Sequence, residues 1–185
     1  MSTEMAYELS LAVALATGVM AHYCYANAWH ASEALAEWSD LLLVEGWVVL
    51  EQTTQVTLIE HCWLEHGNPG RIIDPSMVLL VPRSLLHQVH YFAGVRRTRA
   101  EMQTVACGDL PLVRSSGSYG PDGLEQVDYC TAYAAAHSQA TQLACASSPA
   151  KTVVIQPAAF PETTEARSDL VVRVTSSQTL LRTPP

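Results

Sequence analysis

The sequence predicts an α+β domain in which N-terminal helices pack on an antiparallel sheet. Two features predict this class. Between residues 25 and 38 apolar side chains recur at helical spacing, at Ala28, Ala31, Ala34, Leu35 and Trp38. From residue 41 onwards, short apolar runs separated by turn signals replace that pattern, which is typical of strands. With 185 residues, 49% of them hydrophobic, the chain suffices for one core. We therefore expect a single domain over residues 1–175 and a flexible tail over 176–185.

The order of elements places the chemically interesting residues in the first half of the chain. Two helices are expected over residues 5–20 and 25–38, so that Cys24 stands at the start of the second. Three extended stretches follow at 41–50, 55–65 and 71–81, the last bent at Pro75, and they predict an antiparallel meander. Beyond them we expect helices at 84–91, from residue 98 and at 124–145, a loop at 108–123, and strands at 152–155 and 170–174.

Charge and composition exclude several classes of protein. The formal net charge of −8 argues against nucleic acid as a partner, because binding phosphates requires a basic face. The one local basic cluster, at residues 96–99, fits a solvated helix face equally well. The apolar run 9–20 is too short to span a bilayer and is preceded by Glu4 and Glu8 rather than basic residues. The expectation is thus a cytoplasmic protein without membrane contact. Five cysteines without CxxC spacing indicate mostly reduced thiols.

Cys24, His61 and Asp74 are the candidate catalytic residues. A thiol becomes a good nucleophile when a base takes its proton, and the base needs a third group to hold its tautomer. At a helix N-terminus the positive end of the dipole favours a thiolate at Cys24, and the N–H groups there can donate to an oxyanion. The alternative for each residue is structural: a small buried apolar side chain for Cys24, a core polar group for His61, and Asp-Pro turn chemistry for Asp74.

The hairpin around the Gly67–Gly70 segment tests whether His61 and Asp74 can meet. If all four residues form the loop, His66 pairs with Arg71 and Asp74 becomes a diagonal neighbour of His61 on the same face. If only the first two form the loop, His61 faces Asp74 directly. An odd-length loop or a bulge would instead place the two side chains on opposite faces. Even loop lengths therefore predict a His61–Asp74 pair.

Three neighbouring residues are candidates for a supporting role, each with a structural alternative. Trp63 shares the face of His61 and would shield the imidazole from water. Asn27 lies in the first turn after Cys24, and the structural alternative for it is a cap of that helix. Glu45 lies inside an apolar strand and needs a partner there, so it could orient a site residue or belong to a structural network.

Metal binding is the competing chemistry. Cys24, His61, Cys62, His66 and Asp74 are all metal-ligand types. In a regular strand, however, Cys62 and His66 point to the face opposite His61, and no pair has zinc-finger spacing. Signatures of nucleotide-binding loops, serine hydrolases and zinc proteases are missing from the sequence. We therefore predict no metal and no cofactor.

The local contexts of these residues resemble the transglutaminase-like branch of the papain-like cysteine enzymes, in particular small bacterial and phage members. In that branch a Cys opens a helix packed on an antiparallel sheet, and His-x-Trp and Asp-Pro-[Ser/Thr] follow on adjacent strands. Here these contexts read Cys24, His61-Cys62-Trp63 and Asp74-Pro75-Ser76, with Glu45-Gly46-Trp47 between the first two. The resemblance covers roughly residues 20–80. It departs from the usual pattern beside the nucleophile, where Tyr23 and Tyr25 flank Cys24, and only His22 offers an upstream oxyanion donor.

The resemblance implies a papain/transglutaminase-like fold and a thioester mechanism. Cys24 would attack a peptide or carboxamide carbonyl, His61 would act as base and then acid, and Asp74 would orient His61. The backbone N–H of Cys24 or Tyr25 would bind the oxyanion. We expect hydrolysis, as in a protease or amidase, rather than transglutamination, because water is the default acceptor. The alternatives are an inactive protein-interaction module and, third, a metal-binding protein. The sequence leaves the substrate and the oligomeric state open.

Overall fold

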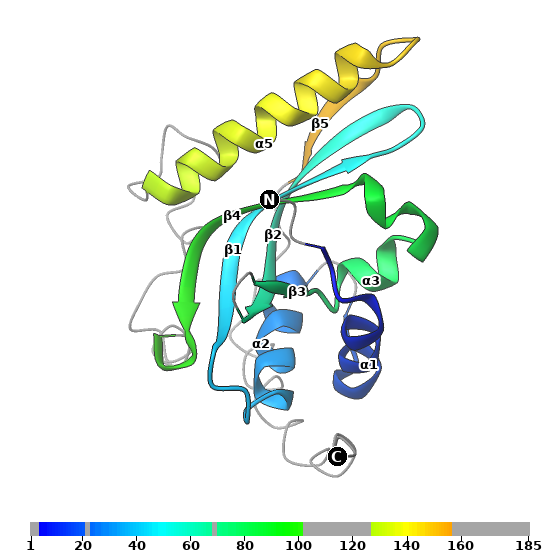
Figure 1. Ribbon diagram of the computed structural model, residues 1–185. Helices are drawn as coiled ribbons and strands as arrows, with labels where there is room; N and C mark the ends of the chain where they lie inside the picture. Colours follow the sequence, from blue (N-terminus) through cyan, green and yellow to red (C-terminus); the bar gives the residue numbers. More distant parts are fainter. Residues whose placement is uncertain (1–3, 21–22, 68–69, 102–126, 157–185) are drawn as a thin grey trace.

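The chain folds as an α+β protein built on an open, mostly antiparallel sheet, as the composition and periodicity predict (Figure 1). A computed structural model describes residues 4–20, 23–67, 70–101 and 127–156. Within these ranges the sheet has five strands in the order β3-β2-β1-β4, with β5 as an additional partner of β2.

A long hairpin forms the centre of the sheet. Strand β1 (Leu41–Glu51) pairs antiparallel with β2 (Gln55–His66) over its whole length. Strand β4 (Val89–Thr98) pairs antiparallel with the other edge of β1. The short β3 (Arg71–Ile73) and the parallel β5 (Thr152–Gln156) share the outer edge of β2 at opposite ends. The three consecutive strands β1, β2 and β3 are the predicted meander.

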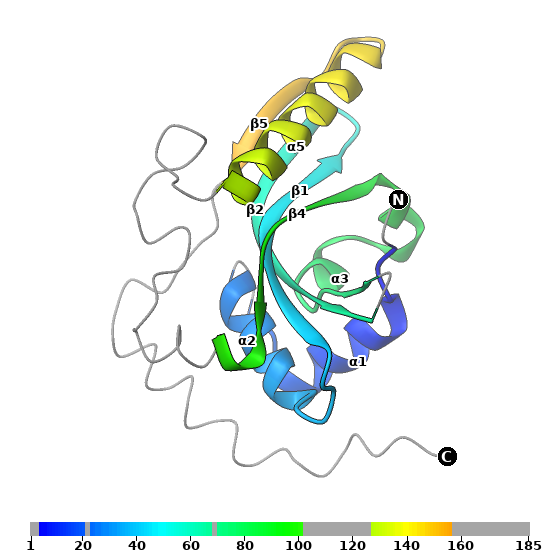
Figure 2. The ribbon, with the colours of Figure 1, turned by 60° about the vertical axis from the view of Figure 1, so that its left-hand side comes forward.

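Helices cover both faces of this sheet. Helix α2 (Cys24–Ala34) and helix α5 (Val127–Ala146) lie over opposite ends of one face, against Leu43 and Cys62 at one end and Trp47 and Leu58 at the other. Figure 2 shows the two helices at opposite ends of β1. Helix α1 (Tyr7–Thr17) and the short α3 (Met77–Leu80) cover the other face around Trp63. Cys24 is the first residue of α2, as predicted.

The third extended stretch is shorter than predicted. The loop has four residues, since His66 pairs with Arg71, but regular pairing ends at Ile73. The expectation of strand through residue 81 was wrong, because the chain turns at residues 74–76 and continues as α3. The turn forms because the Asp74 side chain accepts hydrogen bonds from the backbone N–H groups of Ser76 and Met77. The backbone carbonyl of Asp74 accepts a hydrogen bond from the N–H group of Val78.

The predicted helix at residues 84–91 is also wrong in its second half. A 3₁₀ helix, η1, covers Arg83–Gln88, and β4 begins at Val89. Pairing with β1 outweighs local propensity there. The strand continues past Gly94, where the β1–β4 register shifts. A Cβ at Gly94 would lie 2.8 Å from the Glu45 carbonyl oxygen and 3.0 Å from Tyr129 Cα, so only glycine permits this approach.

The remaining predicted elements are confirmed where the structure describes them. Helix α5 corresponds to the helix expected at 124–145, and β5 to the strand expected at 152–155. At the helix start expected from residue 98, the Thr98 N–H donates to Glu101 Oε2 at 2.7 Å and the Glu101 N–H donates back to Thr98 Oγ1 at 3.4 Å. The loop at 108–123, the strand at 170–174 and the tail lie outside the described residues.

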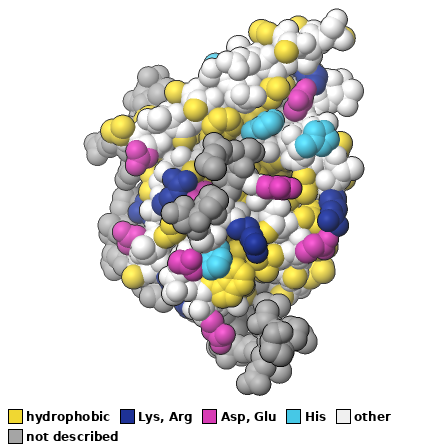
Figure 3. All heavy atoms as spheres, in the orientation of Figure 1, with side chains coloured by type: hydrophobic (Ala, Val, Ile, Leu, Met, Phe, Trp, Pro, Cys, Tyr) yellow, Lys and Arg dark blue, Asp and Glu magenta, His cyan; other side chains and the backbone are white. Residues whose placement is uncertain are grey.

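The three arginines of the basic cluster at residues 96–99 each form an ion pair with a glutamate. Arg96 and Arg97 lie on β4 rather than on a helix, and Arg99 begins the helical turn that follows the strand. The three residues pair with Glu65, Glu45 and Glu33 respectively. Figure 3 shows basic side chains interspersed with acidic ones on that view of the surface. In the described ranges no helix is both long enough and apolar enough to cross a bilayer.

Candidate active site

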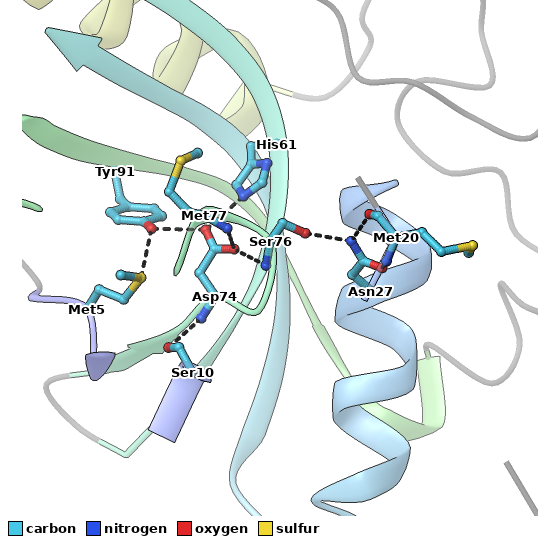
Figure 4. Close-up of polar contacts among 9 residues, drawn as sticks. All are labelled: Met5, Ser10, Met20, Asn27, His61, Asp74, Ser76, Met77 and Tyr91. Atoms are coloured by element: carbon cyan, nitrogen blue, oxygen red, sulfur yellow. Dashed lines mark hydrogen bonds and ion pairs between the residues drawn. The ribbon is translucent and has the colours of Figure 1, made fainter. Parts of the chain in front are cut away.

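His61 and Asp74 form a buried pair on the face of the sheet covered by α1 and α3. Nε2 of His61, in the middle of β2, lies 2.7 Å from Oδ2 of Asp74, in the turn after β3 (Figure 4). Their exposed fractions are 3% and 0%. The carboxylate accepts the Nε2 proton, and this leaves Nδ1 as the ring nitrogen open to another partner. The pair therefore has the geometry of a base held by an orienting acid.

The turn around Asp74 holds the carboxylate in place through hydrogen bonds that do not involve His61. Oδ1 accepts the backbone N–H groups of Ser76 at 3.0 Å and Met77 at 2.8 Å. The Asp74 N–H donates to Oγ of Ser10 on α1 at 3.0 Å. Asp74 thus forms the turn through Oδ1 and contacts His61 through Oδ2, so that each oxygen has separate partners. The turn aims Oδ2 at the imidazole.

Cys24, the first residue of α2, lies close enough to His61 to act on the pKa of its imidazole. Burial by itself would lower the pKa of His61, but the charges of Asp74 and Cys24 and their hydrogen bonds outweigh it and raise the pKa to about 10. Protonated His61 would thus lie between two groups that carry negative charge when ionised. The structure brings together all three residues that the sequence singled out, through α2, β2 and the turn after β3.

The outer edge of β2 is interrupted at this point. Among the described strands, β5 pairs with residues 55–59 and β3 with residues 64–66, so that residues 60–63 lack a partner on that side. His61 lies within the interval, and α2 packs against β2 there with Cys24 and Cys62 in one apolar cluster. The gap lets the first turn of α2 approach the imidazole where another strand would otherwise run.

Trp63 forms the predicted aromatic wall beside His61. The two ring centroids are 6.2 Å apart with planes inclined by 20°, and the indole is fully buried. Gly46 on β1 makes room for it: a Cβ there would lie 2.8 Å from the Trp63 ring and 2.3 Å from the Phe92 carbonyl oxygen. The Glu45-Gly46-Trp47 context noted in the sequence therefore has a packing reason, since the glycine admits the tryptophan that packs beside His61.

Asn27 does not cap α2. Its side chain exchanges hydrogen bonds with the backbone of Met20, as donor at 2.7 Å and acceptor at 3.0 Å, and donates to Ser76 Oγ at 2.8 Å. Figure 4 shows it on α2, facing the turn that carries Asp74. Asn27, one helical turn after Cys24 along α2, thus links the helix of Cys24 to the turn of Asp74.

Tyr25 and Glu45 belong to a polar group on the opposite sheet face. The Tyr25 hydroxyl lies 3.5 Å from Glu45 Oε2, and Oε1 of the same carboxylate accepts from Arg97 Nε at 2.7 Å. Burial first, then the Glu45 charge, raises the pKa of Tyr25 well above its ordinary value. Glu45 is therefore part of a structural ion-pair network and makes no described bond to His61. His22 lies outside the described residues.

Sequence reasoning missed Tyr91 and Ser10, which both bond to Asp74. The Tyr91 hydroxyl donates to Oδ2 at 2.9 Å from β4, and Ser10 Oγ accepts from the backbone. The aromatic pair Tyr91-Phe92 after Val89 was a strand signal. No local pattern marks Ser10, which lies 64 residues from its partner.

Within the described ranges no group of three or more His, Cys, Asp or Glu side chains is arranged to hold a metal ion. Cys62 faces α2, whereas Trp63 faces the α1 and α3 side, as strand alternation predicts. Comparison with known proteins found no matching family model, no matching curated protein and no matching solved structure.

Proposed function

We propose that the protein is a cysteine-dependent acyl-transfer enzyme that cleaves a peptide or carboxamide bond through a thioester. The observation that carries this proposal is the buried His61–Asp74 pair, with 2.7 Å between Nε2 and Oδ2, and the position of Cys24 close enough to act on the pKa of His61. A nucleophile, a base and an acid that orients the base are the three groups that this chemistry requires.

The proposed reaction has two steps. The Cys24 thiolate, whose proton has passed to His61, attacks the carbonyl carbon, and His61 gives that proton to the leaving amine or ammonia as the C–N bond breaks. The now neutral His61 then takes a proton from a water molecule, the hydroxide attacks the thioester, and the C–S bond breaks to release a carboxylic acid and restore the thiolate and the protonated His61. The N–H groups at the start of α2 have no intrahelical acceptors and would donate to the oxyanion in both steps.

The burial of the thiol favours a second candidate, an inactive protein-interaction module. The exposed fraction of Cys24 is 5%, so a substrate has little access to the sulfur without movement of the surrounding chain. The two candidates make opposite predictions for the reactivity of the thiol and for turnover.

Thiol reactivity is tested by alkylation with iodoacetamide at neutral pH, with the labelled cysteines located by peptide mass spectrometry. On the proposal, Cys24 reacts faster in the unmodified protein than in H61Q, because the imidazole no longer activates the sulfur in the variant. The exposed Cys145 and the fully buried Cys62 are internal references whose rates should not change. Equal Cys24 rates in both proteins would favour the inactive module.

Turnover is tested with glutamine-containing peptides, by measuring ammonia release in water and hydroxamate formation when hydroxylamine is added. Hydrolysis predicts ammonia without added amine, whereas a transferase requires the amine. Cys24→Ala should lower either rate about a thousandfold or more, as expected for loss of a nucleophile. A C24A variant as active as the parent would exclude the thioester mechanism.

A further inference from the structure

We propose that Tyr91 is a positioning residue for the His61–Asp74 pair, and that its hydrogen bond to Asp74 sets how tightly the carboxylate holds the His61 proton. The catalytic consequence rests on the proposed function. The effect on His61 itself is measurable without any substrate.

Tyr91 reaches Asp74 from the opposite side of the sheet's central strand. It lies on β4 opposite Val48 of β1, which in turn pairs with Ile59 on β2. Its hydroxyl donates to Oδ2 of Asp74 at 2.9 Å, the same oxygen that accepts the His61 proton at 2.7 Å (Figure 4). Two donors from different strands therefore share one carboxylate oxygen.

The hydroxyl is a permanent donor to this oxygen. Burial first, then the negative charge of Asp74, raises the pKa of Tyr91 well above its ordinary value, so the phenol remains protonated across the neutral range. The hydroxyl also lies 3.5 Å from the sulfur of Met5. A thioether is a weak acceptor compared with a carboxylate, so the proton lies toward Asp74.

Sharing the oxygen weakens its hold on His61. A hydrogen bond to a carboxylate stabilises its charge and makes it a weaker base. Without the Tyr91 hydroxyl, the charge on Oδ2 acts on His61 alone and the imidazolium is favoured further. The carboxylate cannot swing away, because the backbone N–H groups of Ser76 and Met77 still hold Oδ1. The charged groups that act on His61 are Asp74 and Cys24, and the loss of Tyr91 removes neither.

The consequence for the proposed reaction follows from the second step. Water attack requires neutral His61, so an imidazole that keeps its proton to higher pH slows thioester hydrolysis at neutral pH. Loss of the Tyr91 hydroxyl is expected to lower kcat at neutral pH about three- to tenfold and to shift the rising limb of its pH profile upward. A merely structural hydroxyl would change stability without moving that limb.

The test compares Tyr91→Phe with Tyr133→Phe in the full chain, by NMR titration of the His61 ring between about pH 6 and pH 11, with H61Q to assign the signal. Tyr133 is a half-buried control that packs on Trp47 and His137, away from Asp74. The titration midpoint of His61 should rise by about 0.5–1 pH unit in Y91F and stay unchanged in Y133F. An unchanged or lower midpoint in Y91F would overturn the proposal.

A second measurement covers the case in which Y91F folds poorly. Biosynthetic incorporation of fluorotyrosine keeps every hydroxyl but makes it a stronger donor, so the His61 midpoint should fall rather than rise. No shift, or a rise, would contradict the role of Tyr91. If His61 responds as expected but the unmodified protein turns over no substrate, the proposed function fails while the positioning role stands. If the protein turns over substrate but the His61 titration midpoint does not respond to the change at Tyr91, the positioning role fails while the proposed function stands.

Discussion

Nδ2 of Asn27 lies 2.8 Å from Oγ of Ser76, and this bond joins the helix that carries Cys24 to the turn that carries Asp74. The two residues are 49 positions apart and both are buried. The same amide group holds Met20, in the segment that leads into α2. The Asn27 side chain therefore connects the helix of Cys24 to the turn of Asp74 through hydrogen bonds that do not involve His61.

We expect Asn27→Ala to lower the free energy of unfolding more than Ser76→Ala, because it removes three hydrogen bonds rather than one. Both variants should also slow alkylation of Cys24. In a double-mutant cycle measured by urea denaturation, the coupling energy should be about 0.5–1.5 kcal/mol, the usual contribution of a buried hydrogen bond. A coupling energy near zero would mean that the bond does not join the two elements energetically.

Asp74→Asn should be far more damaging than Asp40→Asn, although both aspartates accept a histidine Nε2 at 2.7 Å. Asp74 is fully buried and accepts four hydrogen bonds, whereas the Asp40 side chain is 60% exposed. We expect D74N to lower the unfolding free energy by about 3 kcal/mol and to remove the fast alkylation of Cys24. D40N should change stability by less than about 1 kcal/mol. Similar effects of the two variants would contradict a special role for the buried pair.

Stability should depend on pH through His61 in a defined direction. The pKa of His61 is about 10 in the folded chain and 6.5 when the imidazole is unperturbed, as in the unfolded chain. The contribution of protonated His61 is therefore fully present below about pH 6.5 and is lost as the pH rises through about 10. Urea denaturation from pH 7 to 9, a window below tyrosine ionisation, should show this decline in the parent and a flatter profile in H61Q. Parallel profiles would mean that His61 is not held as an imidazolium.

Arg97→Met and Arg96→Met form a matched pair on one strand. Arg97 bonds to Glu45 with 11% and 0% of the two side chains exposed, whereas the Arg96 side chain, paired with Glu65, is 48% exposed. Loss of the buried partner leaves the Glu45 charge without its guanidinium, and we expect a cost of about 3–5 kcal/mol. The exposed pair should contribute less than about 1 kcal/mol. Thermal or urea unfolding measures both, and equal costs would refute the distinction.

Gly46→Ala tests the room that β1 leaves for Trp63. The added Cβ would lie 2.3 Å from the Phe92 carbonyl oxygen, so the backbone must shift, at a cost of about 1–3 kcal/mol or more. Trp63 would move with it and disturb His61, which should slow the alkylation of Cys24. Gly18→Ala is the control: its φ of 65° makes alanine unfavourable by about 1 kcal/mol, but no atom lies near the new Cβ. Cys24 reactivity should be unchanged in G18A.

Much of the first half of the fold was predictable from local pattern. The periodicity placed Cys24 at a helix start, the apolar runs located β1 and β2, and the turn residues located the four-residue loop. These features depend on near neighbours in the chain. The helix predicted at 84–91 and the strand predicted through 81 were wrong, because pairing with β1 and the hydrogen bonds of Asp74 override weak local preferences there.

Local pattern along the chain is enough to name the residues that could form the site: a thiol at a helix start, an imidazole on a strand and a carboxylate after a turn. How these groups meet depends on contacts between distant parts of the fold. The aim of the Asp74 carboxylate depends on Ser10 from α1 and Tyr91 from β4, and the Cys24 helix is tied down through Ser76. Such contacts escape sequence analysis because a hydrogen bond between residues distant in sequence leaves no periodic pattern: each partner is an ordinary polar side chain until folding brings the two together.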